Sequence, residues 1–203
     1  MSRWTWLAMT GFIVLSSPAS AQYIGLFTDA NATTCVAQVG PNPRVDLHVI
    51  AVLEGGVTEM AGAQFLITGA PAAWTPENVL WVPDVGSAIS LGNPLFPTPL
   101  HPATAGVNVA FSSCVGSPTN RRVPLGRVVL LGPPTEDNVH LRVSWFDLVP
   151  PDPNCPFVLA CDAPIFSMVC VGGGEIVLNG DAPSSCQVAV EENTWTNVKA
   201  LYR

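Results

Sequence analysis

Strict alternation of apolar and polar side chains over residues 138–145, in a predicted strand at 138–148, is the feature that most limits how this chain can fold. Val139, Leu141, Val143 and Trp145 alternate there with Asn138, His140, Arg142 and Ser144. Successive side chains of a strand point to opposite faces, so this pattern predicts a strand with one apolar and one polar face. A helix would scatter the same apolar residues around its axis. The chain therefore needs further strands to cover the apolar face.

Similar short runs recur between turns rich in glycine and proline. They predict strands at residues 23–27, 44–54, 60–68, 78–82, 106–114, 123–131, 157–161, 167–171 and 175–178. In the run 44–54, both faces become apolar at Ile50 and Val52, so we expect this strand to be covered on both sides along its second half. Eight to ten short strands predict an all-β, antiparallel β-sandwich, and the lack of long helical patterns between them excludes a doubly wound α/β fold.

Residues 83–104 are the least strand-like part of the chain, with prolines at positions 83, 94, 97, 99 and 102. Proline has no N–H to donate to a sheet ladder, so we expect an irregular surface segment. Its apolar residues Leu95, Phe96 and Leu100 are expected to cap an open end of the core. The alternative is a ligand-facing apolar patch that includes Phe96.

The N-terminus has the features of an export signal. Arg3 precedes an apolar run over residues 4–15, and residues 17–21 end in the small-x-small pattern of a cleavage site. We expect cleavage after Ala21, so residues 1–21 are a predicted signal peptide. An uncleaved anchor is disfavoured because the apolar run is shorter than about 20 residues. The mature chain is then secreted, periplasmic or on the cell surface, with no membrane span.

Cleavage leaves 182 of the 203 residues, enough for one domain with a real core. Loss of Arg3 leaves seven basic against fifteen acidic residues, a net charge of −8, with Lys199 as the single lysine. Such a surface repels phosphate groups, so nucleic acid and anionic membranes are poor candidates as partners.

Six cysteines follow the predicted signal peptide: Cys35, Cys114, Cys155, Cys161, Cys170 and Cys186. An even number in an exported chain predicts three disulfides. Four of the cysteines cluster between positions 155 and 186, which suggests local bridges there and leaves Cys35 and Cys114 to pair with each other. No C-x-x-C spacing occurs, so structural zinc is disfavoured, and we expect no metal or cofactor.

The last thirteen residues change from a strand-like to a helical pattern. Trp195, Val198, Leu201 and Tyr202 follow helical spacing, with acidic residues at the start of the segment and basic residues at its end. So short a helix must dock on something to be stable. We expect a sandwich domain over residues 22–190 and an amphipathic helix over residues 191–203 packed on it; a docking or sorting tag is the alternative.

The residues also carry a resemblance to a family. The run Gly-Ala-Gln-Phe-Leu-Ile-Thr-Gly at 62–69 and the strands at 107–114 and 125–131 resemble the strand succession of cohesin-like β-sandwiches, which are immunoglobulin-like or jelly-roll modules of secreted bacterial proteins. The tail from Cys161 to Arg203 is similar to the endings of uncharacterised exported bacterial proteins. Cohesins bind dockerin modules, so the resemblance implies extracellular protein binding. No residue here matches a dockerin-contact motif.

Signs of catalysis are missing from the sequence. No G-x-S-x-G motif occurs, and His48, His101 and His140 show no catalytic or metal-binding spacing. A glycosidase needs two facing carboxylates, and the sequence gives no means of pairing Glu54, Asp147 or Glu175. We therefore predict no catalytic residues and no enzyme.

Two binding sites remain as hypotheses. Trp74 and Trp81 flank Pro76 and would form an exposed platform on which a sugar ring stacks, unless they pack in the core or a loop. Asp29 and Asn31 would help to hold Ca²⁺, although an Asx-turn is the simpler interpretation.

The leading functional prediction is a secreted, non-catalytic structural or adhesion-type module that contacts other extracellular proteins. The alternative is a carbohydrate-binding module that uses Trp74 and Trp81 to hold a polysaccharide.

Overall fold

The computed structural model describes residues 22–54, 56–100, 102–133, 136–145, 155–162, 167–181 and 186. The predicted signal peptide (1–21) and the predicted helix (191–203) lie outside these residues. The described ranges form β-strands and contain no helix. Accordingly, no helix that could cross a membrane is found among them.

The strands come in the following order. They are β1 (Tyr23–Phe27), β2 (Val36–Ala37), β3 (Arg44–Val52), β4 (Glu59–Thr68), β5 (Val79–Pro83), β6 (Ser87–Asn93), β7 (Gly106–Gly116), β8 (Arg122–Leu131), β9 (Val139–Ser144), β10 (Phe157–Ala160), β11 (Ser167–Cys170), β12 (Gly172–Gly173) and β13 (Glu175–Leu178).

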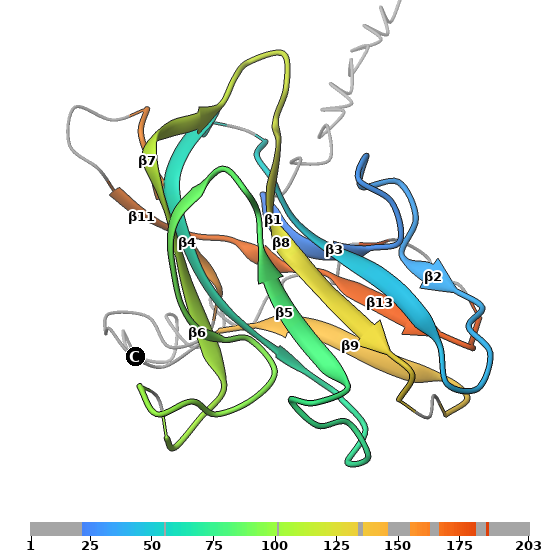
Figure 1. Cartoon of the computed structure of the whole chain (residues 1–203). Helices are drawn as coiled ribbons and strands as arrows, with labels where there is room; N and C mark the ends of the chain where they lie inside the picture. The colour runs from blue at the N-terminus through green and yellow to red at the C-terminus, as the bar shows by residue number, and fades with distance from the viewer. Residues whose placement is uncertain are drawn as a thin grey trace, which may run out of the picture.

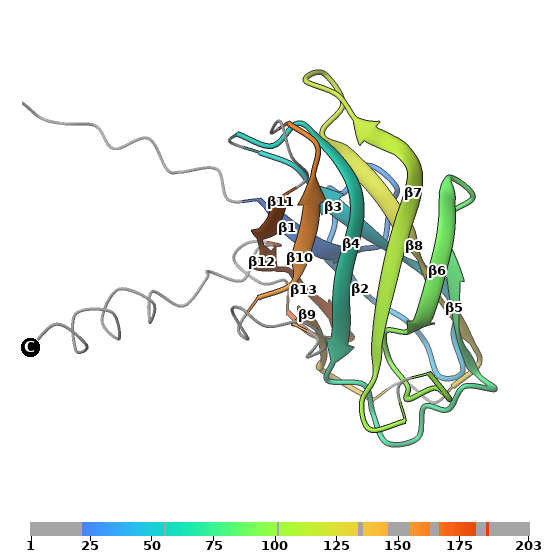
Figure 2. The ribbon, with the colours of Figure 1, turned by 90° about the vertical axis from the view of Figure 1, so that its left-hand side faces the viewer.

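These strands form two sheets that face each other (Figure 1). The small sheet has the order β12-β1-β3-β8-β5. The large sheet has the order β11-β10-β4-β9-β13-β2, and it continues from β4 through β7 to β6 (Figure 2). Most neighbours are antiparallel, as predicted. The expectation of a purely antiparallel sandwich is wrong at two pairs, because β1–β12 and β2–β13 are parallel.

The alternation of apolar and polar residues that predicted a strand at 138–148 is confirmed, although the strand is shorter than predicted. Val139, Leu141 and Val143 are buried in the core and His140 is exposed. The strand β9 ends at Ser144, which pairs with Leu66 of β4. The next stretch of the same β4 edge is occupied by β10. Residues 146–148 of the predicted strand lie outside the described residues.

The glycines at 172–174, which separate two predicted strands, form a crossing between the sheets. The chain leaves β11, pairs with β1 of the small sheet through β12, and returns to the large sheet as β13. A Cβ on Gly173 would lie 2.0 Å from the carbonyl oxygen of Val143, and one on Gly174 would lie 2.8 Å from the Cα of Gly25. Three backbones meet here at distances that only glycine permits.

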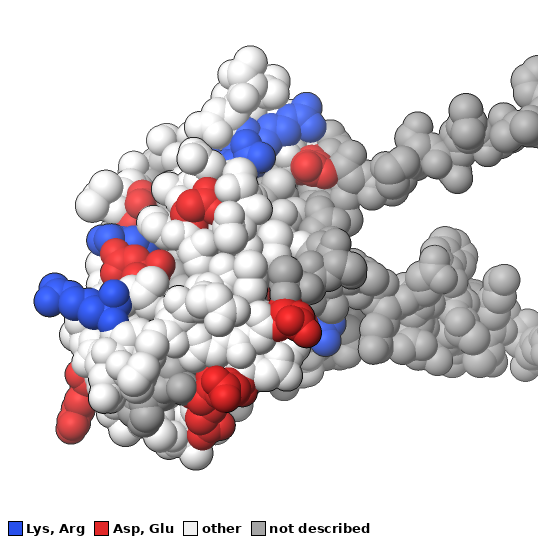
Figure 3. Space-filling view, turned by 90° about the vertical axis from the view of Figure 1, so that its right-hand side faces the viewer, with Lys and Arg blue, Asp and Glu red and all other residues white. Residues whose placement is uncertain are grey.

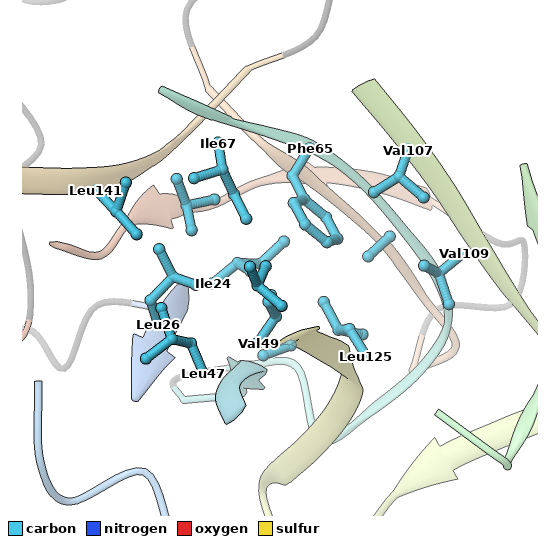
Figure 4. Packing of buried hydrophobic residues seen from close by; sticks show 14 of the residues in the cluster. Ile24, Leu26, Leu47, Val49, Phe65, Ile67, Val107, Val109, Leu125 and Leu141 are labelled. Carbon is cyan, nitrogen blue, oxygen red and sulfur yellow. The ribbon is translucent and has the colours of Figure 1, made fainter. Parts of the chain in front are cut away.

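The core lies between the two inner faces. Figure 4 shows side chains of both sheets pointing toward one another, with Phe65 and Ile67 of the large sheet above Val49 and Leu125 of the small sheet. The residues that share the inward phase of the second and third predicted strands, Leu47, Val49, Ala51, Leu53, Ala63, Phe65 and Ile67, are buried there, and Val45 of the same phase is partly buried against them. These positions confirm the period-two prediction.

A second apolar cluster covers part of the other side of the small sheet. It contains Tyr23, Phe27, Cys35, Ile50 and Val52, and Cys186 packs against it. This confirms that the second half of β3 is covered on both faces.

The proline-rich segment is less irregular than predicted, because residues 87–93 form β6 against β7. The prolines at 94, 97, 99 and 102 all follow this strand, so they do not interrupt its ladder. Leu95 is buried and Phe96 packs against the core, as predicted for a cap. Leu100 is 65% exposed, so the capping prediction is wrong for that residue.

Three disulfides are present: Cys35–Cys186, Cys114–Cys161 and Cys155–Cys170. The local bridge Cys155–Cys170 agrees with the clustering of cysteines, but the expected Cys35–Cys114 pair is wrong. The N–H of Val177 in β13 donates to the carbonyl of Cys35, and the N–H of Glu175 donates to that of Cys186. Strand pairing thus brings Cys35 to Cys186, whereas Cys114 lies in β7.

Candidate interaction surface

Five adjacent strands of the large sheet, β6, β7, β4, β10 and β11, present an outer face that we call the panel (Figure 2). These strands contain a single charged residue, Glu59, at the first position of β4. The chain as a whole carries a net charge of −7. The panel is therefore a neutral region on an acidic protein.

The register defines which side chains lie on the panel. Val107, Val109 and Phe65 point into the core, so the residues that alternate with them point outward. One row across the five strands consists of Ile89, Ala110, Gly62, Leu159 and Met168. The next row consists of Leu91, Asn108, Gln64, Phe157 and Cys170. The first row is wholly apolar and the second has no charge.

The two ends of the panel are open to solvent. Ile89 and Leu91 of β6 are 53% and 48% exposed, and Met168 of β11 is 45% exposed. In the middle of the second row, Gln64 and Phe157 are buried. Large apolar side chains left in water beside neutral neighbours are typical of a surface that binds another molecule.

The outer face of the small sheet carries charged residues, unlike the panel. Strands β3 and β8 carry Arg44, Asp46, Arg122 and Arg127 there, and Figure 3 shows side chains of both signs of charge on that side of the molecule. The Nη1 atom of Arg127 lies 2.5 Å from Oδ2 of Asp46. This half-exposed ion pair is screened by water and contributes little to stability.

No catalytic constellation appears among the described residues. His140 contacts the carboxylate of Glu175 through Nδ1, and its Nε2 lies 3.1 Å from Oδ1 of Asn138. Neither of these contacts pairs the exposed histidine with a serine, threonine or cysteine side chain. No group of three or more His, Cys, Asp or Glu side chains in the described part of the chain is placed to hold a metal ion.

The loop with Asp29 is an Asx-turn, as the simpler interpretation predicted. The Asp29 carboxylate accepts the N–H of Asn31 and the N–H of Thr34, each at 2.8 Å, and the Thr33 hydroxyl at 3.0 Å. Burial acts to raise the pKa of Asp29, but the hydrogen bonds from Thr33, Asn31 and Thr34 outweigh it and hold that pKa below its usual value. These oxygens are engaged by the loop itself, so the calcium alternative has no support from the geometry.

The predicted tryptophan platform is wrong. Trp74 is a core residue with 4% of its surface exposed. Trp81 is partly buried, its ring meets that of Phe65 edge-on with centroids 5.9 Å apart, and its Nε1 donates to Oγ of Ser90 at 3.1 Å. In β5 it shares the inward phase of Val79, which the alternation with exposed Leu80 already signals.

Comparisons with known proteins leave the family open. No family model matches the chain, and no curated protein matches it. Among solved structures, one similar chain is a cohesin module. It comes from a family 33 glycoside hydrolase of Clostridium perfringens ATCC13124, and the match covers 79% of this chain and 98% of that one at 13% identity, with a TM-score of 0.40. So distant a likeness carries no functional argument.

The panel was not predicted from the sequence. Its two most exposed large apolar residues, Ile89 and Leu91, lie in a segment predicted to be irregular. Their alternation with Ser90 and Gly92 was a weak strand signal, hidden by the prolines that follow. The neutral outward residues of the five strands lie side by side because of the strand register. A local sequence pattern does not determine that register.

Proposed function

We propose that the mature chain is a secreted, non-catalytic β-sandwich module that works by contacting another extracellular protein through the open, β6–β7 side of the panel. The observation that carries this proposal is the pair of neutral rows in which Ile89 and Leu91 remain half exposed. The three disulfides support export to an oxidising compartment.

The physical case rests on desolvation. A partner that covers neutral, apolar residues pays no cost for stripping water from charges, and it gains about 25 cal/mol for each Å² of apolar surface removed from water. Each charge on the opposite face would have to be paired or left hydrated. Burying the panel in an interface therefore costs less desolvation free energy than burying the opposite face.

The test places one negative charge in the panel without changing its shape. Asn108 lies between Leu91 and Gln64 in the second row, so Asn108→Asp adds a charge that a bound partner would cover. The matched control is Asn42→Asp in the exposed turn before β3, where the residue has φ 54° and aspartate is tolerated. Both variants change the net charge equally.

Purified mature protein, immobilised through its C-terminus, is incubated with the secreted proteins of the source organism. We expect a retained protein that binds the wild type and Asn42→Asp equally, and binds Asn108→Asp about tenfold or more weakly, which corresponds to at least about 1.4 kcal/mol for burying an unpaired charge. Equal binding to all three would remove the panel as the contact surface. Retention of a polysaccharide and of no protein would contradict the proposal.

A further inference from the structure

The large sheet ends at β6 in an edge that has little protection. This strand pairs with β7 along one side and with no described strand along the other. Free edges expose backbone N–H and C=O groups, and natural proteins usually blunt them with short length, proline, charge or a bulge.

The other edge strands in the described residues show such protection. β2 and β12 have two residues each, β11 has four, and β5 has five and ends in Pro83. β6 has seven residues, Ser-Ala-Ile-Ser-Leu-Gly-Asn, with neither proline nor charge. Its one irregularity, between Ser87 and Ile89, leaves residues 89–93 regularly paired with β7.

We infer that β6 pairs antiparallel with β6 of a second copy of this chain, which joins the two large sheets into one. The arrangement of apolar residues on the strand is self-complementary. Ile89 and Leu91 flank Ser90 symmetrically, so a two-fold axis at Ser90 places Ile89 opposite Leu91 of the second copy, and Leu91 opposite its Ile89. Directly opposed aliphatic pairs of this kind stabilise an antiparallel ladder.

Charge also selects a second copy as the occupant. Two acidic chains repel each other wherever their charged strands would meet, but β6 and its neighbour β7 hold no charge at all. Because the two-fold contact uses the same strand from both copies, it closes on itself and stops at a dimer. This inference goes beyond the proposed function, since it needs no foreign protein.

The first test is the oligomeric state of the purified mature chain over a concentration series, measured by sedimentation velocity. We expect a monomer–dimer equilibrium with a dissociation constant on the order of 10 μM, because one strand-to-strand contact buries less than the roughly 1,600 Å² of a standard interface. Ile89→Lys and Leu91→Lys should be monomers throughout. Leu131→Lys, at an exposed apolar residue of the opposite face, should dimerise like the wild type.

A second test reads the register itself. Opposed residues in an antiparallel pair have Cα atoms about 4.5–5.5 Å apart, within reach of a disulfide, whereas diagonal positions are roughly 7–8 Å apart. A mixture of Ile89→Cys and Leu91→Cys chains should therefore give disulfide-linked dimers under mild oxidation, and either variant alone should not.

Different outcomes overturn the inference. A wild type that stays monomeric at about 100 μM, ten times the expected dissociation constant, rules out this pairing. Dimers that persist in both lysine variants place the interface elsewhere, and higher oligomers contradict a closed two-fold contact. These experiments use the purified chain alone, without a partner protein. Their results are therefore independent of the retention experiment with Asn108→Asp.

Discussion

One group of outward-facing apolar residues is covered on the small sheet, and another group is left open on the large sheet. On the small sheet, Phe27, Ile50 and Val52 point away from the main core and are buried in a second cluster, beside the Cys35–Cys186 disulfide. On the large sheet, Ile89 and Leu91 also point away from the core but remain about half exposed. The covered face adds to folding stability, whereas the open face gains its hydrophobic free energy only when something binds.

The largest expected effect concerns the disulfide that holds the cover of the small sheet. Cys35 and Cys186 are 151 residues apart, and Cys155 and Cys170 are 15 apart. In the chain-entropy model the longer loop contributes about 5 kcal/mol and the shorter about 3 kcal/mol. Urea unfolding of the paired Cys→Ser variants measures both values. A smaller loss from the long bridge than from the short one would contradict the idea that it clamps a second core.

The next prediction compares two outward-facing residues directly. Phe27→Ala removes a fully buried ring from the second cluster and should cost about 3–5 kcal/mol of unfolding free energy. Leu91→Ala, on the open panel, should change it by less than about 0.5 kcal/mol. Denaturant midpoints of the two variants measure both changes in unfolding free energy. Similar losses for both would mean that the panel is already covered.

A third variant tests the contact between β5 and β6, the edge strands that lie together on one side of the sandwich. A Cβ on Gly126 would lie 2.3 Å from Cη2 of Trp81, the ring that bridges to Ser90 of β6. Gly126→Ala should displace this ring and cost about 1–3 kcal/mol. Gly40→Ala, which meets nothing within 4 Å, is the matched control. Thermal unfolding and the near-UV circular dichroism of Trp81 report the change, and an unaltered tryptophan signal would argue against the contact.

The smallest effect depends on pH and concerns the anchor between β10 and β4. Hydrogen bonds from the Thr58 hydroxyl and N–H, and from the Glu59 N–H, outweigh burial and hold the pKa of Asp162 below its usual value. A lowered pKa in the folded state means that this stabilisation is complete above about pH 4 and is lost as the pH falls through the folded value.

For this exposed group the gain is less than about 1 kcal/mol, because water screens it. Asp162→Asn should therefore be slightly less stable than the wild type at pH 7, and the difference should shrink as the pH falls through the folded pKa. Urea midpoints across this range measure it, with Asp181→Asn, an exposed carboxylate outside the strands, as the control. A difference independent of pH would show that Asp162 does not act through its charge.

Much of the fold could be predicted because burial of strands leaves a local pattern. The alternation at Val139, Leu141 and Val143 and the doubly apolar end of β3 each identified a strand and its covered faces. The prediction of a tryptophan platform is wrong because Trp81 follows the inward phase of β5, which proximity to Pro76 does not change. The prolines after residue 93 similarly hid β6.

The sequence by itself determined the all-β class, the inward residues of the main strands and the expectation of three disulfides, because each follows from side chains a few positions apart or from simple number. Only the tertiary structure decided which cysteines pair, that Gly172–Gly173 crosses to the small sheet, and that neutral residues of five strands form one surface. These features depend on which strands become neighbours. That choice is made by packing of segments far apart along the chain, where one residue of register moves every side chain to the other face.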